Sequence, residues 1–440
     1  MTLAKTAPSG PAIFSRMGRN LAWLLGGRGF QAVASIAYLG IAARALGPAG
    51  FGEFSLILAY GQAIANVAQL QSWQTVIRYG TLHIAAVARD RLGRLLAFTM
   101  VLDMAGALLG AAVALLAVPL VASFLGWADH EQGRAAWFGV ALLLSIGATP
   151  TGMLRLVDRF DLIAYAQAVG PLVRLAGAGL VWFRGGGVEQ FLVAWAAAAL
   201  LQHLATWSLA LLCTDLPIRP SRESLSRSRT ENPGIWHFML TTNAAGTIGL
   251  LSEQLATLAV GGMAGATAAG GFRIAAKIAR ALARPIQIAA RIVYPELARL
   301  HAHADRATFD LVGSRVAWLG LLLGVLALLL GTLCGPLLIR LLAGEEFAFA
   351  RWMLALLAFG VAVDLSGFTL EPLLVARGEA GRVLHIRLLG ALLFAALLFV
   401  GLHLAGPIGA AGATVAASLL MRFLLGRAAS RGAAPRTVSA

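Results

Sequence analysis

Six polar side chains, five of them cationic, recur at helical spacing in the second half of the sequence. They are Arg273, Lys277, Arg280, Arg284, Gln287 and Arg291. At about 100° per residue they form one stripe roughly 80° wide, and at about 1.5 Å per residue the stripe is roughly 27 Å long. That length is close to the thickness of the hydrocarbon core of a bilayer. The stripe could bind an anion through charge-assisted hydrogen bonds.

Other charged residues also fall inside apolar segments. The cations are Arg28 and Arg174, and the acids are Asp103, Glu253 and Asp364. A charge at the bilayer centre costs about 2.5–3.5 kcal/mol, so these groups must face water, a counter-ion or a substrate. The acids could pair with the cations and hold helices together, or they could bind a coupling proton or Na⁺. Even if every acid pairs, the balance stays positive, which favours an anion-attracting cavity.

Other chemistries find little support. His301, His303 and Asp305 resemble a metal cluster in composition, but they lie in a polar segment that we interpret as a solvated loop. We expect no disulfide between Cys213 and Cys334, because the topology places them near opposite membrane faces. No Ser/His/Asp, Cys/His or HExxH arrangement is present. The sequence therefore predicts a protein that is not an enzyme, with no catalytic residues, no metal and no cofactor other than a coupling ion.

The composition indicates a polytopic membrane protein. Of the 440 residues, 59% are hydrophobic and only 12% are charged, and the mean hydropathy is +0.79. Soluble domains carry about 25% charged residues. The net charge of +15 does not indicate nucleic acid here, because the basic residues lie between apolar runs. Segments long enough to span a bilayer occur near 21–46, 54–78, 95–125, 136–156, 162–183, 188–213, 236–261, 268–294, 312–342, 350–376, 383–402 and 405–426.

Loop charges and composition organise these twelve predicted helices. Lys and Arg gather in alternate loops, which places both termini in the cytoplasm by the positive-inside rule. The segment rich in Ser, Pro and Arg near 214–233 predicts a flexible cytoplasmic linker. We therefore expect an N-terminal six-helix lobe over 1–213, a linker over 214–235 and a C-terminal six-helix lobe over 236–440.

The two halves share a motif. Gly47-x4-Gly52-x-Phe54 recurs as Gly265-x4-Gly270-x-Phe272, 218 residues later. Two six-helix repeats would be parallel, with a substrate site between them. Subtracting 218 from the positions of the cationic stripe gives a stripe in the first half that contains the neutral polar residues Gln62, Asn66 and Gln69. The sequence thus predicts a polar cavity wall formed by Gln62, Asn66 and Gln69, with Gln287 on the opposite helix.

Two segments resemble bacterial polysaccharide and O-antigen flippases. These segments are RALGPAGFGEFSL, residues 44–56, and the Gly265–Phe272 motif with the helix after it, which ends at YPEL, residues 294–297. The flippases belong to the multidrug/oligosaccharidyl-lipid/polysaccharide exporter superfamily. The resemblance implies two lobes around a cavity that opens alternately to each face. It also implies a cargo of sugar repeat units on an undecaprenyl-type diphosphate, moved from the inner to the outer leaflet.

We therefore predict a monomeric flippase in a bacterial inner membrane, which binds a lipid-linked oligosaccharide and the phospholipid bilayer. A glycan polymerase or ligase would be its possible partner. One alternative is a cation-coupled drug exporter of the same superfamily, whose cavity should be lined with acids. A peptidoglycan-precursor flippase would be expected to carry two further helices. A membrane glycan polymerase or ligase would be expected to have a large outer loop, whereas the longest loop predicted here is cytoplasmic.

Overall fold

The computed structural model describes residues 10–213, 218, 221–282, 318, 320–376 and 379–431. Within these ranges the chain consists of helices joined by short turns and contains no strand. The first half comprises α1 Gly10–Ala68, α2 Ser72–Ala85, α3 Arg89–Leu125, α4 Asp129–Leu143, α5 Thr149–Leu156, α6 Phe160–Phe183, α7 Val188–Cys213 and α8 Arg222–Glu231. The second half comprises α9 Ile235–Ala264, helical residues 266–282 and 320–329, η1 Leu330–Cys334, α12 Gly335–Ala343, η2 Glu345–Ala350, α13 Arg351–Ser366, α14 Leu370–Ala376 and α15 Ala380–Arg431.

Seven helical stretches of the described chain are long and apolar enough to cross a membrane. They are Gly29–Ala85, Arg89–Leu125, Phe160–Phe183, Val188–Cys213, Gly320–Ala343, Glu345–Ser366 and Gly381–Ser430. The first and last have 57 and 50 residues, more than twice the ~20 residues that one span needs, and each is interrupted by a backbone break. The prediction of an all-helical polytopic membrane protein is confirmed.

The breaks in α1 and α15 have the same chemical origin. Gly47 and Gly406 adopt positive φ angles of 64° and 55°, and each precedes a proline. A positive φ is easily adopted only by glycine, and proline supplies no N–H group to continue the helical hydrogen bonds. The sequence predicted the first interruption, because Gly47 lies between the segments 21–46 and 54–78. It placed the second at 403–404, just before the observed break at Ala405 and Gly406, which fall inside the predicted segment 405–426.

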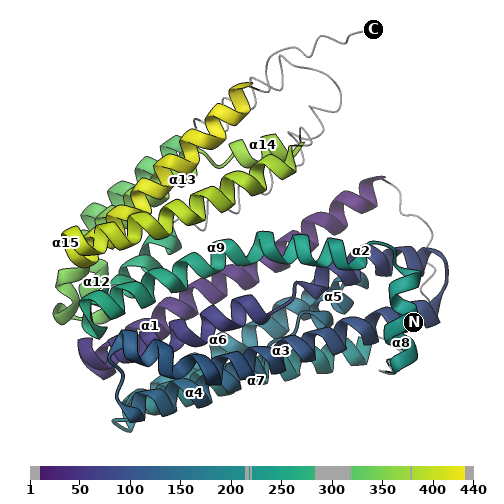
Figure 1. Ribbon diagram of the computed structural model, residues 1–440, viewed down its shortest axis with the longest axis horizontal. Coiled ribbons are helices and arrows are strands. Elements are labelled where there is room, and N and C mark those ends of the chain that lie inside the picture. The colour runs from purple at the N-terminus through teal and green to yellow at the C-terminus, as the bar shows by residue number, and fades with distance from the viewer. Residues whose placement is uncertain are drawn as a thin grey trace. The chain divides into compact units, whose positions relative to one another are not determined.

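The chain forms two compact units. Unit 1 comprises Met1–Ala45 and Ile57–Gln254, and unit 2 comprises Leu46–Leu56 and Leu255–Ala440. In unit 1, α6 packs on α7, α2 packs on α3 and α5, and α3 packs on α4 and α5 (Figure 1). A buried core in unit 1 is built from residues of α2, α3, α5, α6, α7 and α9, among them Tyr79, Phe98 and Met153. In unit 2, α13 and α14 both pack on α15.

The repeated motifs have matching backbones. Gly47 and Gly265, the first glycines of the two copies, have φ angles of 64° and 87°. Within unit 2 the second glycines touch, since a Cβ atom on Gly52 would lie 2.1 Å from the carbonyl oxygen of Ala266 and one on Gly270 would lie 3.2 Å from the Cα atom of Gly52. The motif therefore marks a close helix contact, which only residues without a Cβ atom allow.

The segment predicted to be a flexible linker contains a helix instead. The hydroxyl group of Ser221 accepts the backbone N–H of Ser224 at 3.0 Å and caps α8. At the other end, Arg94 of α3 donates to both carboxylate oxygens of Glu231, at 3.1 and 2.5 Å. The side chain of Asn232 lies 2.9 Å from the Nε2 atom of His83. The local composition predicted a flexible linker. It could not reveal the contacts that hold α8, because their partners Arg94 and His83 lie about 140 positions earlier in the chain.

Candidate functional site

Half of the cationic stripe lies within the described residues. Arg273, Lys277 and Arg280 are on the helix 266–282 of unit 2, whereas Arg284, Gln287 and Arg291 lie outside the described residues. Arg273 is only 2% exposed, and Lys277 and Arg280 are partly exposed. A ligand would therefore reach the described part of the stripe at Lys277 and Arg280.

The predicted neutral wall is only partly continuous. Gln62 and Asn66 are one turn apart on α1, but α1 ends at Ala68, so Gln69 lies in the break before α2. The uninterrupted helix predicted over 54–78 is therefore wrong at residues 69–71. Asn66 also has structural partners in α9: its side chain donates to the carbonyl oxygen of Leu250 at 3.5 Å, and the hydroxyl group of Thr247 donates to its backbone carbonyl at 3.3 Å.

Arg174 lies on α6 in unit 1, well inside a helix of 24 residues. Its guanidinium carbon is 4.4 Å from the centre of the ring of Trp195 on α7, a cation–π distance. Its Nε–H donates to the backbone carbonyl of Gly170 at 3.3 Å. No carboxylate of the described chain pairs with it, and no described residue accepts a hydrogen bond from its Nη atoms.

Because Gly170 has no side chain, the carboxamide group of Gln202 can lie close to the guanidinium group of Arg174. A Cβ atom on Gly170 would lie 2.0 Å from the Oε1 atom of Gln202 and 3.2 Å from the Nη2 atom of Arg174. The carboxamide of Gln202 and one edge of the guanidinium group thus both lie against the bare Cα atom of this glycine. One turn earlier on α6, the carboxamide of Gln167 accepts from the side chain of Gln31 at 3.4 Å. This part of unit 1 therefore brings together the guanidinium group of Arg174, the indole ring of Trp195 and the carboxamide groups of Gln202 and Gln167.

Asp103, on α3 of unit 1, is 8% exposed. Its Oδ2 atom accepts four hydrogen bonds, two from hydroxyl groups and two from backbone N–H groups. The hydroxyl donors are Ser72 at 3.0 Å and Thr149 at 2.7 Å, and the backbone donors are Ala148 at 3.0 Å and Thr149 at 2.9 Å. Asp103 makes no ion pair with a described residue, so it is not a partner of the intramembrane arginines there.

The remaining predicted residues are distributed between the units. Glu253 on α9 belongs to unit 1 and is partly exposed. Asp364 on α13 belongs to unit 2 and accepts a hydrogen bond from the side chain of Ser418 on α15. The side chain of Arg28 and the residues His301, His303 and Asp305 lie outside what the structure describes.

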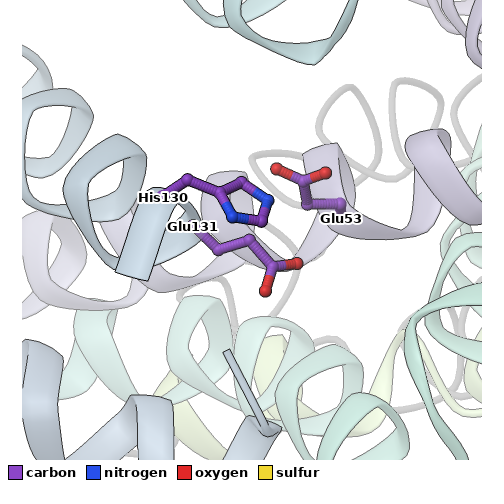
Figure 2. A group of neighbouring side chains, drawn as sticks. All are labelled: Glu53, His130 and Glu131. Carbon is purple, nitrogen blue, oxygen red and sulfur yellow. The ribbon is translucent and has the colours of Figure 1, made fainter. Parts of the chain in front are cut away.

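Figure 2 shows the side chains of Glu53, His130 and Glu131, whose types are those of metal ligands. Glu131 already accepts the backbone N–H of Ala128 at 2.8 Å and so caps the N-terminus of α4. His130 and Glu131 belong to unit 1 and Glu53 to unit 2, and we assign no metal site to them.

Sequence reasoning missed four residues that contribute to these arrangements. They are Ser72, Thr149, Trp195 and Gln202. Two signals were present. Thr149 precedes Pro150, and proline is favoured in the first turn of a helix, so this pair marks a helix start inside the segment 136–156. Trp195 lies eight residues into α7, further from the helix end than an interfacial aromatic residue needs to be.

A family model described as "Polysaccharide biosynthesis protein" matches residues 17–301. The chain belongs to this polysaccharide biosynthesis protein family. The matched region includes Asp103, Arg174 and the whole of the stripe from Arg273 to Arg291. The flippase resemblance carried by the two glycine motifs is thereby confirmed.

One sequence relative and two solved structures are similar to this member of the polysaccharide biosynthesis protein family. Inner membrane protein YghQ of Escherichia coli (strain K12) is 29% identical over 333 residues, covering 75% of this chain and 93% of YghQ. An inward-facing multidrug resistance MATE family transporter of the MOP superfamily superposes with a TM-score of 0.76 at 14% identity, over 91% of this chain and 94% of that one. The lipid II flippase MurJ, in an inward closed conformation, gives 0.70 at 13% identity, over 92% and 87%. At these identities the two structures show the fold alone.

Proposed function

We propose that this protein moves an undecaprenyl-diphosphate-linked oligosaccharide, such as an O-antigen, capsule or exopolysaccharide repeat unit, from the inner to the outer leaflet by alternating access. The family assignment supports a role in polysaccharide biosynthesis. The fold supports a transporter, and it is shared with a protein named as a lipid II flippase. Arg174 is the observation that carries the proposal.

Arg174 is costly where it lies unless an anion compensates it. A cation near the middle of a membrane helix costs about 2.5–3.5 kcal/mol on insertion scales. The ring of Trp195 offsets part of this, since a desolvated cation–π contact contributes about 2 kcal/mol. The planar Nη edge has no acceptor among the described residues and has the geometry to bind a carboxylate or phosphate with two parallel hydrogen bonds. An anionic group of the cargo supplies the missing partner.

In this proposal the lipid diphosphate is bound by the stripe, at Lys277, Arg280 and Arg284, with Arg273 and Arg291 at its ends. Arg174 and Arg28 provide further positive charge for the anionic cargo. Gln62, Asn66, Gln69 and Gln287 bind hydroxyl groups of the glycan. Two charges of opposite sign 4 Å apart attract by about 4 kcal/mol at an effective dielectric constant of about 20, so several cations together hold a doubly charged diphosphate strongly.

The proposal includes a location and partners. The protein lies in the bacterial inner membrane with both termini in the cytoplasm, as the loop charges predict and as the name of the relative YghQ supports. It works as a monomer and receives its cargo on a lipid carrier, and the polymerase or ligase that extends or attaches the glycan acts after it. No nucleic acid takes part.

A drug exporter is the alternative that the fold favours, because the MATE transporter has the same fold. Such a protein binds organic cations and needs free acids in its cavity. In unit 1, one carboxyl oxygen of Asp103, Oδ2, instead accepts four hydrogen bonds, while Arg174 has no described acid partner. Extrusion of an organic cation by the purified protein, without movement of lipid-linked oligosaccharide, would favour the exporter.

The experiment compares R174Q, R174K and the control R184Q in cells that lack the chromosomal gene. Arg184 follows the last residue of α6 and is exposed, so R184Q removes one charge outside the proposed site. We expect R174Q to lower surface glycan at least tenfold, equivalent to about 1.4 kcal/mol, with lipid-linked oligosaccharide accumulating in the inner leaflet. R174K should retain partial activity, because lysine keeps the charge but not the planar fork. Normal export by R174Q at an equal membrane level would contradict the proposal.

A further inference from the structure

Asp103 lies where two helices of unit 1 are interrupted. α1 ends at Ala68 and α2 starts at Ser72, while α4 ends at Leu143 and α5 starts at Thr149. The hydroxyl group of Ser72 and the backbone N–H groups of Ala148 and Thr149 all point to the Oδ2 atom of Asp103. Non-helical backbone at membrane depth requires polar partners, and this one carboxyl oxygen serves both interruptions.

The other carboxyl oxygen, Oδ1, is different. It is buried and has no hydrogen-bond partner among the described residues. An ionised carboxylate with one saturated oxygen and one bare oxygen leaves half of its charge unsolvated, and an unsatisfied buried charged group is expensive. Binding a proton at Oδ1 removes that charge and keeps Oδ2 as an acceptor for the four donors. The neutral acid therefore keeps the four hydrogen bonds at Oδ2 without the buried charge.

The ionisable groups on the surrounding helices contact other partners. On α2, Arg78 stacks on Phe238, Tyr79 donates to the carbonyl of Pro233, and His83 contacts Asn232. On α5, the guanidinium group of Arg155 stacks 4.0 Å from the ring centre of Trp73.

On the other neighbouring helices, the described ionisable group close to an interruption is His203, which lies beside the break between α4 and α5. On α1, Tyr60 donates to the carbonyl of Ala114. The charged residues of α3 and α4 lie near their first turns, at Arg89, Asp90, Arg91, Arg94, Asp129, His130, Glu131 and Arg134. On α7, the ring of His203 packs against Gly147, beside the interruption between α4 and α5. None of these groups forms an ion pair with Asp103. A proton is thus the charge-neutralising partner that the described surroundings leave for it.

We propose that Asp103 is a proton-binding site, with the proton carried on Oδ1, that controls how tightly the starts of α2 and α5 are held. In the ionised form all four hydrogen bonds are charge-assisted, and such bonds are roughly twice as strong as neutral ones. Binding a proton (Asp⁻ + H⁺ → AspH) weakens all four together and loosens both helix starts. Since a membrane proton gradient loads and unloads such a group, this site would couple the gradient to the transport described under Proposed function, on which that last step rests.

A bound Na⁺ fits the site less well. Na⁺ is coordinated by oxygen lone pairs, as other hard cations are. The four N–H and O–H donors are all directed at Oδ2, and their positive hydrogens oppose a metal cation bound to that oxygen, so Na⁺ could not be held by both carboxyl oxygens.

The test measures the carbonyl stretching band of a protonated carboxyl group by infrared difference spectroscopy between pH 8 and pH 5. It uses the full-length protein in lipid nanodiscs without cargo. We expect one band component in the wild type that is lost in D103N and retained in D364N, which removes another carboxyl group from a predicted span. Asparagine keeps an acceptor oxygen for the four donors, so D103N should fold, as its thermal unfolding would show.

A second variant keeps the test decisive if D103N does not fold. The double substitution S72A/T149V removes both hydroxyl donors but leaves the acid, and it should shift the band to appear at a higher pH. Identical spectra for the wild type and D103N, or no shift in S72A/T149V, would overturn the proton site. A band that disappears when Na⁺ is added would assign the site to Na⁺ instead. Because the band is recorded without cargo, loss of flippase activity alone would leave this result intact and would count against the proposed function.

Discussion

Neutralising Glu231 should release α8 from α3. The two side chains make a bidentate contact, with Nε–Oε2 and Nη2–Oε1 distances of 3.1 and 2.5 Å, and are only 23% and 16% exposed for Arg94 and Glu231. Hydrogen bonds to charged groups contribute about 1.5–3 kcal/mol, against about 0–1 for an exposed ion pair. We therefore expect E231Q to weaken the docking of α8 by about 1.5–3 kcal/mol, or roughly 10- to 150-fold in its opening equilibrium.

The assay is amide hydrogen exchange of α8 in the wild type, E231Q, R94Q and the double variant, because local opening exposes these amides. These four proteins form a double-mutant cycle. The coupling energy between Arg94 and Glu231 from this cycle should account for most of the docking free energy that E231Q loses. E223Q is the matched control on the same helix. Glu223 pairs with Arg227 at 65% and 61% exposure, so its removal should change exchange little. Equal exchange in E231Q and the wild type at pH 7, or a coupling energy near zero, would refute the reasoning.

The same pair predicts a pH dependence. The hydrogen bond from Arg94 holds the pKa of the Glu231 carboxyl group below its ordinary value of 4.5. The undocked form thus binds a proton more readily than the docked form, and the stabilisation is fully present above pH 4.5. It is lost as the pH falls below 4.5 through the docked-state pKa. After correction for intrinsic exchange rates, wild-type α8 should open there, whereas E231Q should show no such step.

Two further substitutions test the packing. G409A should lower the stability of the folded protein by about 1–3 kcal/mol in thermal unfolding, because the added Cβ atom would meet the backbone carbonyl of Gly401, whereas G412A has open space and should be nearly neutral. N232A should leave the buried His83 without its side-chain partner, cost about 1–3 kcal/mol and raise hydrogen exchange at the end of α8; unchanged exchange would contradict the contact.

The sequence predicted the helices because their apolar runs are long, and it predicted a break at Gly47 between two such runs. It placed the break near Gly406 two to three residues too early, although a Gly-Pro pair is a local signal at both positions. It failed at residues 69–71, because Gln69, Leu70 and Gln71 are not residues that break a helix. That break is held by Asp103, whose partners are 31 and 46 residues away in the chain. A contact between such distant residues leaves no periodicity in the sequence.

For the candidate site too, local sequence signals were readable, whereas contacts between residues distant in the chain were not. The types and spacing of the charges led us to expect polar faces on two helices, and they singled out Arg174 and Asp103 as residues that need a partner. They did not predict that Asp103 is satisfied by neutral donors, or that Trp195 and Gln202 lie beside Arg174. Charge counting treats every intramembrane acid as a possible partner for every intramembrane base. The packing of α6 on α7 and of α2 on α5 decides which groups meet.

The most direct test of the proposed function is translocation by the purified protein in proteoliposomes that contain a fluorescent lipid-diphosphate-linked oligosaccharide. Accessibility of the glycan to an external hydrolase reports its leaflet. We predict that the wild type moves the glycan between leaflets, that R184Q does so at the same rate, and that R174Q is at least tenfold slower. A glycan that stays in its leaflet with active, folded wild-type protein, or that moves equally fast with R174Q, would contradict the account.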